Sequence, residues 1–363
     1  MRVSGVFLAV IAFCAAACQE SSASRASSGS GDAPSSAAAP AKPNTVVNLN
    51  GAGATFPYPI YSKWFSEYNK LHPTVEINYQ SIGSGGGIRQ LGERTVFFGA
   101  SDQPMSDEML AKASGPILHF PTVLGAVVPI YNIEGLSTQI KFTGPVIADI
   151  FLGKIKKWND PAIVTLNRGV SLPSSDITVA HRSDGSGTTF VFADYLSKIS
   201  PEWKQKVGAN SSLNWPVGVG GKGNEGVAGL VTQTPGSLGY VELVYALQNK
   251  ISYGAVQNQS GEFIVPDVAS VTAAAAGALP TMPKDFRVSI TDSPGKGAYP
   301  ISSFTWILLY EDPQDKNQAK IMNDFMKWAL NDGQAMAGDL GYAKLPEQLV
   351  PLEVEQLNRI KAQ

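Results

Sequence analysis

The feature that most constrains the fold is a repeated alternation of short apolar runs with helical patterns. The run VVNLNGAG is followed by PYPIYSKWFSEYNKLH, then by VEINYQSIG and a glycine-rich stretch that leads into IRQLGERT. In the first helical pattern Ile60, Trp64, Tyr68 and Leu71 recur at helical spacing, which predicts a face packed against the core. Strands and helices that alternate in this way favour an α/β fold with largely parallel strands.

The start of the chain has the composition of an export signal. Residues 1–17 contain the charged Arg2, an apolar run over residues 6–13, and small residues before Cys18. The apolar run is shorter than the roughly 20 residues that a membrane-spanning helix needs. We therefore predict that residues 1–17 form a signal peptide and that the mature protein is exported.

Cys18 follows three alanines and resembles the lipobox of bacterial lipoproteins, in which the thiol carries lipid. The usual leucine three places before the cysteine is Ala15 here, so ordinary signal-peptidase cleavage stays open as an alternative. Residues 18–46 are small, polar and proline-dotted, and such segments bury too little apolar surface to fold. We expect a flexible, lipid-anchored tether, and thus a periplasmic protein held at a membrane through Cys18.

Composition excludes several classes of function. Cys14 and Cys18 are the only cysteines, so the folded part should have neither a disulfide nor a catalytic thiol. The three histidines lack the spacing of metal ligands, and no metal or cofactor is predicted. With 28 basic and 30 acidic residues, the chain has no basic excess for nucleic acid. A small anion remains compatible, because a few aimed dipoles can hold it.

Three segments share one layout: a strand, a turn of glycine and hydroxyl residues, and then a helix. They are GAGATFP at residues 51–57, IGSGGGIRQ at 82–90 and RSDGSGTTFVF at 182–192. Helix N-termini present unpaired N–H groups and a partial positive charge, and small residues let an anion approach them closely. Taken singly, each segment is better explained by ordinary helix capping. The three together predict a cradle for a tetrahedral anion.

Charged residues refine this hypothesis. Arg182 supplies a planar fork suited to an oxyanion, and Asp184 is placed to orient it, with a plain Asx turn as the alternative. Asp102 lies in the turn of FFGASDQPMSDE, and an ionised carboxylate can only accept hydrogen bonds. It would reward phosphate, which carries a proton at neutral pH, and penalise sulfate, which does not. Asp102 could equally serve as a turn or cap residue.

One further glycine pattern is not assigned a function. Gly218, Gly220 and Gly223 in PVGVGGKGNEG match the GxGxxG dinucleotide fingerprint, with Glu242 downstream. The preceding NSSLNWPVG contains Pro216 and no convincing strand, and an exported lipoprotein would seldom meet NAD.

Taken together, these motifs with LGKIKKWNDPAI and YPISSFTWILL resemble the phosphate-binding protein of the bacterial phosphate-specific ABC transporter, the PstS family. The resemblance runs from about residue 47 to near the C-terminus. It implies an α/β, two-lobed periplasmic binding protein fold of type II, with a ligand cleft between lobes joined by crossing strands. Lobe I would comprise residues 47–123 plus 299–363, and lobe II residues 124–298.

The resemblance also implies the ligand and its contacts. Arg182 would pair with phosphate and with Asp184, and Asp102 would accept the ligand proton. The remaining phosphate donors would be Thr55, Phe56, Ser84, Ser186, Gly187 and Thr188. The chain departs from the family in having Gly85 where a second serine is common. The implied protein is a monomeric, non-enzymatic receptor without a cofactor, whose partners are inorganic phosphate and the permease subunits of the transporter.

The residues alone leave other functions open. A secreted phosphatase would also gather oxyanion donors, although no metal cluster or reactive nucleophile is visible in the sequence. A receptor for sulfate or molybdate, or a surface-anchored adhesin or sensor, could use the same cleft.

Overall fold

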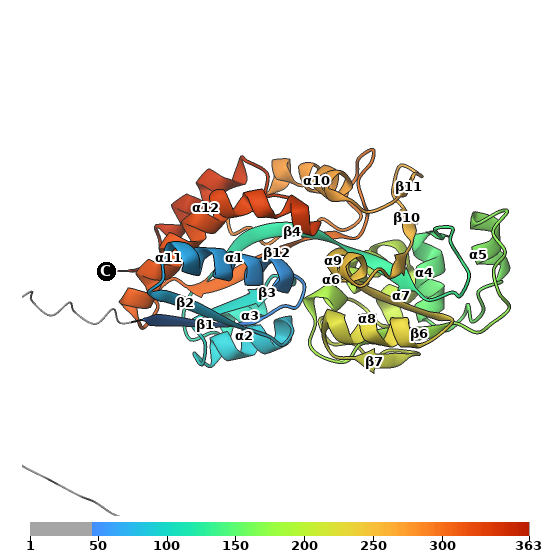
Figure 1. Ribbon diagram of the computed structural model, residues 1–363, viewed down its shortest axis with the longest axis horizontal. Coiled ribbons are helices and arrows are strands. Elements are labelled where there is room, and N and C mark those ends of the chain that lie inside the picture. The colour runs from blue at the N-terminus through green and yellow to red at the C-terminus, as the bar shows by residue number, and fades with distance from the viewer. Residues whose placement is uncertain (1–45, 363) are drawn as a thin grey trace, which may run out of the picture. The chain divides into compact units, whose positions relative to one another are not determined.

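The structure is a computed structural model that describes residues 46–362 (Figure 1). The predicted signal peptide at residues 1–17, Cys18, and all but the last residue of the predicted tether lie outside this range. Among the described residues, no helix combines the length and apolar character that crossing a membrane requires.

The chain begins as the predicted alternation of strands and helices. Its first elements are β1 (Val47–Gly53), α1 (Tyr58–Leu71), β2 (Val75–Ser81), α2 (Ser84–Gly92), β3 (Phe98–Ser101) and α3 (Asp107–Ala111). β1 pairs in parallel with β2 on one side and with β3 on the other. The carboxyl ends of the three strands therefore lie at one edge of the sheet, and so do the turns that follow them.

The core face of α1 differs from the prediction at one position. Ile60, Trp64 and Tyr68 are buried as expected, but Leu71 is 60% exposed. Leu71 is the last residue of α1, and residues 69–73 are all exposed. The periodicity therefore identified the correct face, but the end of the helix projects beyond the layer that covers it.

The second part of the chain repeats the pattern with shorter strands. Its elements are β5 (Lys141–Phe142), α4 (Gly144–Phe151), α5 (Pro161–Leu166), β6 (Thr178–Arg182), α6 (Gly187–Ile199), α7 (Pro201–Lys206), β7 (Val219–Gly221), α8 (Gly223–Gln233), β8 (Ser237–Glu242), α9 (Leu243–Gln248), β9 (Ser252–Tyr253), β10 (Ala255–Gln257), β11 (Phe263–Ile264) and α10 (Val268–Ala276). β6 pairs in parallel with β7 and with β8, while β11, β10 and β5 form a small separate sheet.

Two long strands join these parts into two lobes. β4 (Ile117–Tyr131) is buried along its whole length; residues 117–126 pair with β12 (Ser302–Tyr310), and residues 127–131 pair with β8. The resulting sheet has the order β2-β1-β3-β12-β4-β8-β6-β7, and Figure 1 shows β4 passing from one lobe into the other. The predicted α/β, two-lobed fold is confirmed, whereas the predicted lobe boundaries at residues 123 and 299 stay a prediction.

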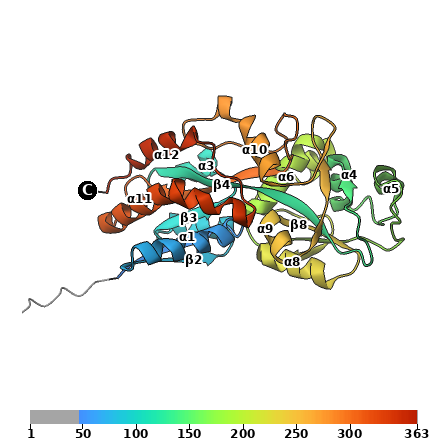
Figure 2. The same ribbon diagram turned by 45° about the horizontal axis from the view of Figure 1, so that its top comes forward.

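The C-terminal elements cover the first lobe and the crossing strands. They are the 3₁₀ turns η1 (Leu279–Thr281), η2 (Asp332–Met336) and η3 (Gly338–Leu340), and the helices α11 (Lys316–Leu330) and α12 (Leu349–Leu357). α11 packs beside β1, and α10 packs against both β4 and β12. Figure 2 shows α11 and α12 over the first lobe and α10 nearer the middle of the molecule. This cover buries both faces of the crossing strands, which explains why neither β4 nor β12 alternates between buried and exposed residues.

Candidate functional site

The structure brings the three glycine and hydroxyl turns together. Thr55 and Phe56 lie between β1 and α1, Ser84 begins α2, and Ser186 immediately precedes α6. The amide of Gly187 donates to Ser84 Oγ at 3.0 Å, which joins the second turn to the third. The amide of Gly85 donates to the Gly185 carbonyl at 2.9 Å. The two lobes therefore touch at these turns, with three helix N-termini directed to one place.

Two glycines make this approach possible. The Cα of Gly185 lies 3.1 Å from where a Cβ on Gly85 would stand, so a side chain there would press on the opposite turn. At Gly187 an added Cβ would meet Ser84 Oγ and would lie 2.6 Å from Asp102 Oδ2. The second close approach places Ser84, Asp102 and Gly187 around the same small volume, which we call the cradle.

The hydroxyls in the cradle have different surroundings. Ser186 is the N-cap of α6, because its Oγ accepts from the amide of Thr189 at 3.0 Å. Ser84 Oγ accepts from the amides of Asp102, at 3.2 Å, and of Gly187. Thr55 and Thr188 are both buried, and neither hydroxyl caps its own helix. The contact seen for the Ser186 side chain is therefore that of an ordinary helix cap.

Phe56 contributes to the site mainly through its backbone groups. Its ring is fully buried, and its carbonyl accepts from the Tyr342 hydroxyl at 2.6 Å. Within residues 46–362, its N–H donates to no backbone acceptor. The Thr55 carbonyl is likewise occupied, since it accepts from Tyr245 Oη at 2.5 Å. The carbonyls of this turn are therefore tied back into the fold, and the Phe56 N–H is left as a donor.

Arg182 and Asp184 form a two-bond pair beside the cradle. Nε donates to Oδ1 at 2.8 Å and Nη2 to Oδ2 at 2.6 Å, and the amide of Gly223 adds a third bond to Oδ1 at 3.1 Å. Burial favours the neutral acid, but the hydrogen bonds and charge of Arg182 outweigh it, so the pKa of Asp184 lies below its ordinary value. The guanidinium is thus held in one orientation. Its Nη1 is buried and has no partner among residues 46–362.

Asp102 faces the cradle from the end of β3. Its Oδ1 accepts from the Thr305 hydroxyl at 2.8 Å, while its buried Oδ2 has no partner among the described residues. Burial raises the pKa of Asp102 to about 7, although the Thr305 hydrogen bond, the Arg182 guanidinium and the Thr188 hydroxyl act in the opposite direction. The cradle therefore combines many N–H and O–H donors with a single acceptor that changes charge near neutral pH.

A second buried carboxyl nearby adds no negative charge. Glu242 ends β8, and its Oε2 accepts from the amide of Val244 at 2.8 Å. Burial raises the pKa of Glu242 well above its ordinary value, and the nearby Asp102 raises it further. We therefore take Glu242 as the neutral acid, so that it does not repel an anion held by Arg182.

Three residues at this site were not predicted from the sequence. Thr305 orients Asp102, Tyr245 holds the first turn, and Asn224 hydrogen-bonds to Thr55 and Thr188. Asn224 lies in the glycine pattern of PVGVGGKGNEG, from which no site residue was predicted. The sequence pattern did not indicate β7, a strand of only three residues that leads into α8 at Gly223, where φ is +74°. The pattern is a fourth strand, turn and helix whose N-terminus reaches the cradle.

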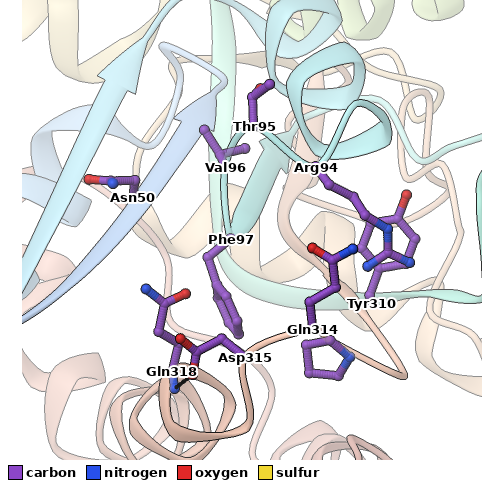
Figure 3. A pocket seen from close by; sticks show the side chains of 10 residues that line it. Asn50, Arg94, Thr95, Val96, Phe97, Tyr310, Gln314, Asp315 and Gln318 are labelled. Carbon is purple, nitrogen blue, oxygen red and sulfur yellow. Dashed lines mark hydrogen bonds between the residues drawn. The ribbon is translucent and has the colours of Figure 1, made fainter.

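The described part of the chain also has a surface pocket away from the cradle. It measures about 190 Å³ and is lined by Asn50, Arg94, Thr95, Val96, Phe97, Tyr310, Pro313, Gln314, Asp315 and Gln318 (Figure 3). The Arg94 guanidinium lies 3.7 Å over the Tyr310 ring, and Asp315 caps α11 by accepting from the amide of Gln318. Both charged side chains have structural contacts, so the cradle is the stronger candidate site.

No metal site accompanies the cradle. Within residues 46–362, no group of three or more histidine, cysteine, aspartate or glutamate side chains is placed to hold a metal ion. What the arrangement can do chemically is hold a small, tetrahedral oxyanion out of water, with a cation on one side and a proton acceptor on the other.

Comparison with known proteins gives a consistent result. A family model described as the PBP superfamily domain matches residues 34–332. The chain is 48% identical over 334 residues to the phosphate-binding protein PstS of Xylella fastidiosa strain Temecula1, covering 92% of this chain and 91% of the relative. It is 38% identical over 342 residues to the protein of that name from Methanocaldococcus jannaschii, covering 88% of each.

Solved structures share the fold. A high-affinity periplasmic phosphate-binding protein, solved with phosphate at pH 8.5, has a TM-score of 0.67 and 20% identity, covering 85% of this chain and 93% of that one. A phosphate-binding protein from Stenotrophomonas maltophilia has a TM-score of 0.67 and 17% identity with the same coverage. At such identities the likeness concerns the fold alone.

Proposed function

Because this chain belongs to the PstS family of phosphate-binding proteins, within the PBP superfamily, we propose that it binds inorganic phosphate tightly and delivers it to the permease of an ABC transporter. The main support for this proposal is a pair of buried polar atoms without partners in the described part of the chain. A buried guanidinium nitrogen, Arg182 Nη1, and a buried carboxyl oxygen, Asp102 Oδ2, both lack partners among residues 46–362 and lie where helix N-termini converge. Phosphate at neutral pH offers oxygens for the first and a proton for the second.

The binding step follows from the contacts. Phosphate would accept from Arg182 and from N–H and O–H groups of Thr55, Phe56, Ser84, Ser186, Gly187 and Thr188, while Asp102 accepts its proton. The Gly187 N–H, which donates to Ser84 Oγ in this structure, would exchange that bond for one to the anion. Charge-assisted hydrogen bonds contribute roughly 1.5–3 kcal/mol each, so several together exceed the cost of bringing the lobes together. Since these groups come from both lobes, the anion binds the closed arrangement better than an open one, and closure follows from that difference.

Release would require the lobes to separate again. We propose that docking on the permease subunits favours the open arrangement, so that the same contacts that hold phosphate are lost together. The proposed receptor acts as a monomer, and no step makes or breaks a covalent bond.

Calorimetry on ligand-stripped protein tests this function. We expect tight, one-to-one binding of inorganic phosphate, binding of sulfate that is weaker by on the order of 10⁴ at pH 8, and no turnover of a phosphate ester. Steady release of phosphate from the ester would favour the phosphatase alternative, and equal affinity for sulfate would favour a general oxyanion receptor.

Export and anchoring complete the proposal. The layout of residues 1–17, the cysteine at position 18 and the polar composition of residues 18–46 support a periplasmic lipoprotein that carries its receptor on a tether. Cys18→Ser is expected to move the protein from the membrane fraction to the soluble fraction, measured by immunoblotting of fractionated cells. Equal membrane association of the variant and the parent would contradict the anchor and leave the phosphate proposal intact.

A further inference from the structure

Asn224 is a buried residue that contacts a hydroxyl from each lobe. It lies in the first turn of α8 and is 0% exposed. Its side-chain Nδ2 donates to Thr55 Oγ1 at 2.7 Å and to Thr188 Oγ1 at 3.2 Å, and its backbone N–H donates to Thr55 Oγ1 at 3.3 Å. One asparagine therefore supplies three donor contacts to two threonines of the cradle.

The orientation of the Asn224 amide is determined by a third partner. Its Oδ1 accepts from the backbone N–H of Glu242 at 3.0 Å. Exchanging Oδ1 and Nδ2 would set two N–H groups against each other at Glu242, so the amide has only one satisfactory orientation. The nitrogen must face the threonines.

The hydrogen bonds that Asn224 donates determine the direction in which the threonine O–H groups can point. A hydroxyl has one proton to donate and two lone pairs that accept. At Thr55 two N–H groups occupy both lone pairs, so its own proton is left for donation. At Thr188 one lone pair is occupied in the same way. This matters for an anion, because a hydroxyl that presents a lone pair to it repels it, whereas one that presents a proton binds it.

We propose that Asn224 is a positioning residue that fixes the proton direction of Thr55 and turns the proton of Thr188 away from Asn224, toward the side of the cradle where Asp102 and the anion lie, so that both hydroxyls can donate to the bound anion. This inference rests on the proposed phosphate function and adds to it. It also explains why α8 begins at the cradle: the three contacts come from the first turn of that helix and join elements from both lobes.

The test compares Asn224→Asp with Asn224→Ala by phosphate calorimetry from pH 5 to pH 8. An aspartate keeps the shape and can still accept from the Glu242 amide, but its carboxylate accepts the threonine protons instead of donating. At pH 8 we expect Asn224→Ala to bind phosphate about 10- to 100-fold more weakly than the parent. We expect Asn224→Asp to be weaker than Asn224→Ala by a further factor of about 10.

Lowering the pH distinguishes a role of residue 224 in orienting the threonine hydroxyls from a role in structural support alone. Once protonated, the introduced carboxyl regains one O–H donor, so Asn224→Asp should become tighter than Asn224→Ala near pH 5. The ionisable groups around the cradle are common to both variants, so the ratio of the two affinities removes the part of their titration that the new carboxyl does not alter. These groups are Asp102, Arg182, Asp184, Glu225 and Glu242. A ratio that stays constant from pH 5 to pH 8 would overturn the inference.

A buried asparagine elsewhere serves as the control. Asn167 follows α5, accepts from the amide of Lys141 and donates to the carbonyls of Lys141 and Ile163. The helix that it follows, α5, lies at the far end of the second lobe (Figure 1), and Asn167→Asp should leave phosphate affinity unchanged. If Asn224→Asp does not fold, Asn224→Ala binding within about threefold of the parent overturns the inference. A parent protein that binds no phosphate would instead remove the proposed function.

Discussion

Arg182→Ala is expected to weaken phosphate binding by about 100- to 10,000-fold, measured by calorimetry at pH 8. The Arg182 side chain is 1% exposed, and removing one partner of a buried ion pair typically costs about 3–5 kcal/mol. Two effects add in the same direction. The anion loses a charge-assisted bond from Nη1, and the Asp184 carboxylate is left without its cation and faces the anion directly.

Two further variants identify the source of this loss. Arg182→Lys keeps the positive charge but cannot bond Asp184 through two nitrogens and phosphate through a third, so only part of the affinity should return. Arg359→Ala removes an arginine that pairs with Glu311 through two bonds on the surface, where the Arg359 side chain is 53% exposed. It should leave binding unchanged. Unaltered affinity in Arg182→Ala would show that the cradle is not the phosphate site.

Much of the fold could be predicted because the signals for it are local. The strand and helix alternation lies within short windows, and the turns at residues 51–57, 82–90 and 182–192 each contain their glycine and hydroxyl residues. Arg182 and Asp184 are two positions apart, so their pairing needed no knowledge of the fold. The roles assigned to these residues in binding phosphate remain predictions until the variants are measured.

The parts that could not be predicted depend on contacts between distant positions. Thr305 reaches Asp102 across 203 positions because β12 pairs with β3, which sets Trp306 opposite Ser101. An apolar run such as SSFTWILLY gives no sign of which strand it will join. β4 is similar, since its continuous apolar sequence does not reveal that it changes partner from β12 to β8 between residues 126 and 127.

Asn224 was missed for a different reason. Its segment contributes to the family resemblance without indicating a role for the asparagine, and β7 is too short to produce a strand pattern of its own. The available signal was the same as in the other turns: glycine residues followed by a polar residue at a helix start. Because the contribution of Asn224 is to donate to hydroxyls and not to the anion, only the geometry shows its direction.

Asp102→Asn is expected to remove most of the discrimination between phosphate and sulfate. A site built around one substrate hydrogen bond can reject the analogue that lacks it by on the order of 10⁴. In the parent protein, Asp102 Oδ2 would accept the phosphate proton, and sulfate offers none at neutral pH. Asparagine has no charge and presents an N–H as well as an oxygen, so we expect sulfate to bind at least about 100-fold more tightly than it does to the parent, while phosphate binding weakens.

The pH dependence of the sulfate affinity tests the role of Asp102 most directly. Burial raises the pKa of Asp102 to about 7, so the carboxyl is mostly ionised at pH 8 and mostly protonated at pH 6. Sulfate can enter only when the carboxyl is protonated; its affinity for the parent should therefore rise about tenfold per pH unit above pH 7 as the pH falls, and level off below pH 7. For Asp102→Asn the same titration should be flat. Glu353→Gln, which removes another fully buried carboxyl from α12, should keep the parent's profile. A parent whose sulfate affinity does not change between pH 6 and pH 8 would show that Asp102 is not the group that rejects unprotonated anions.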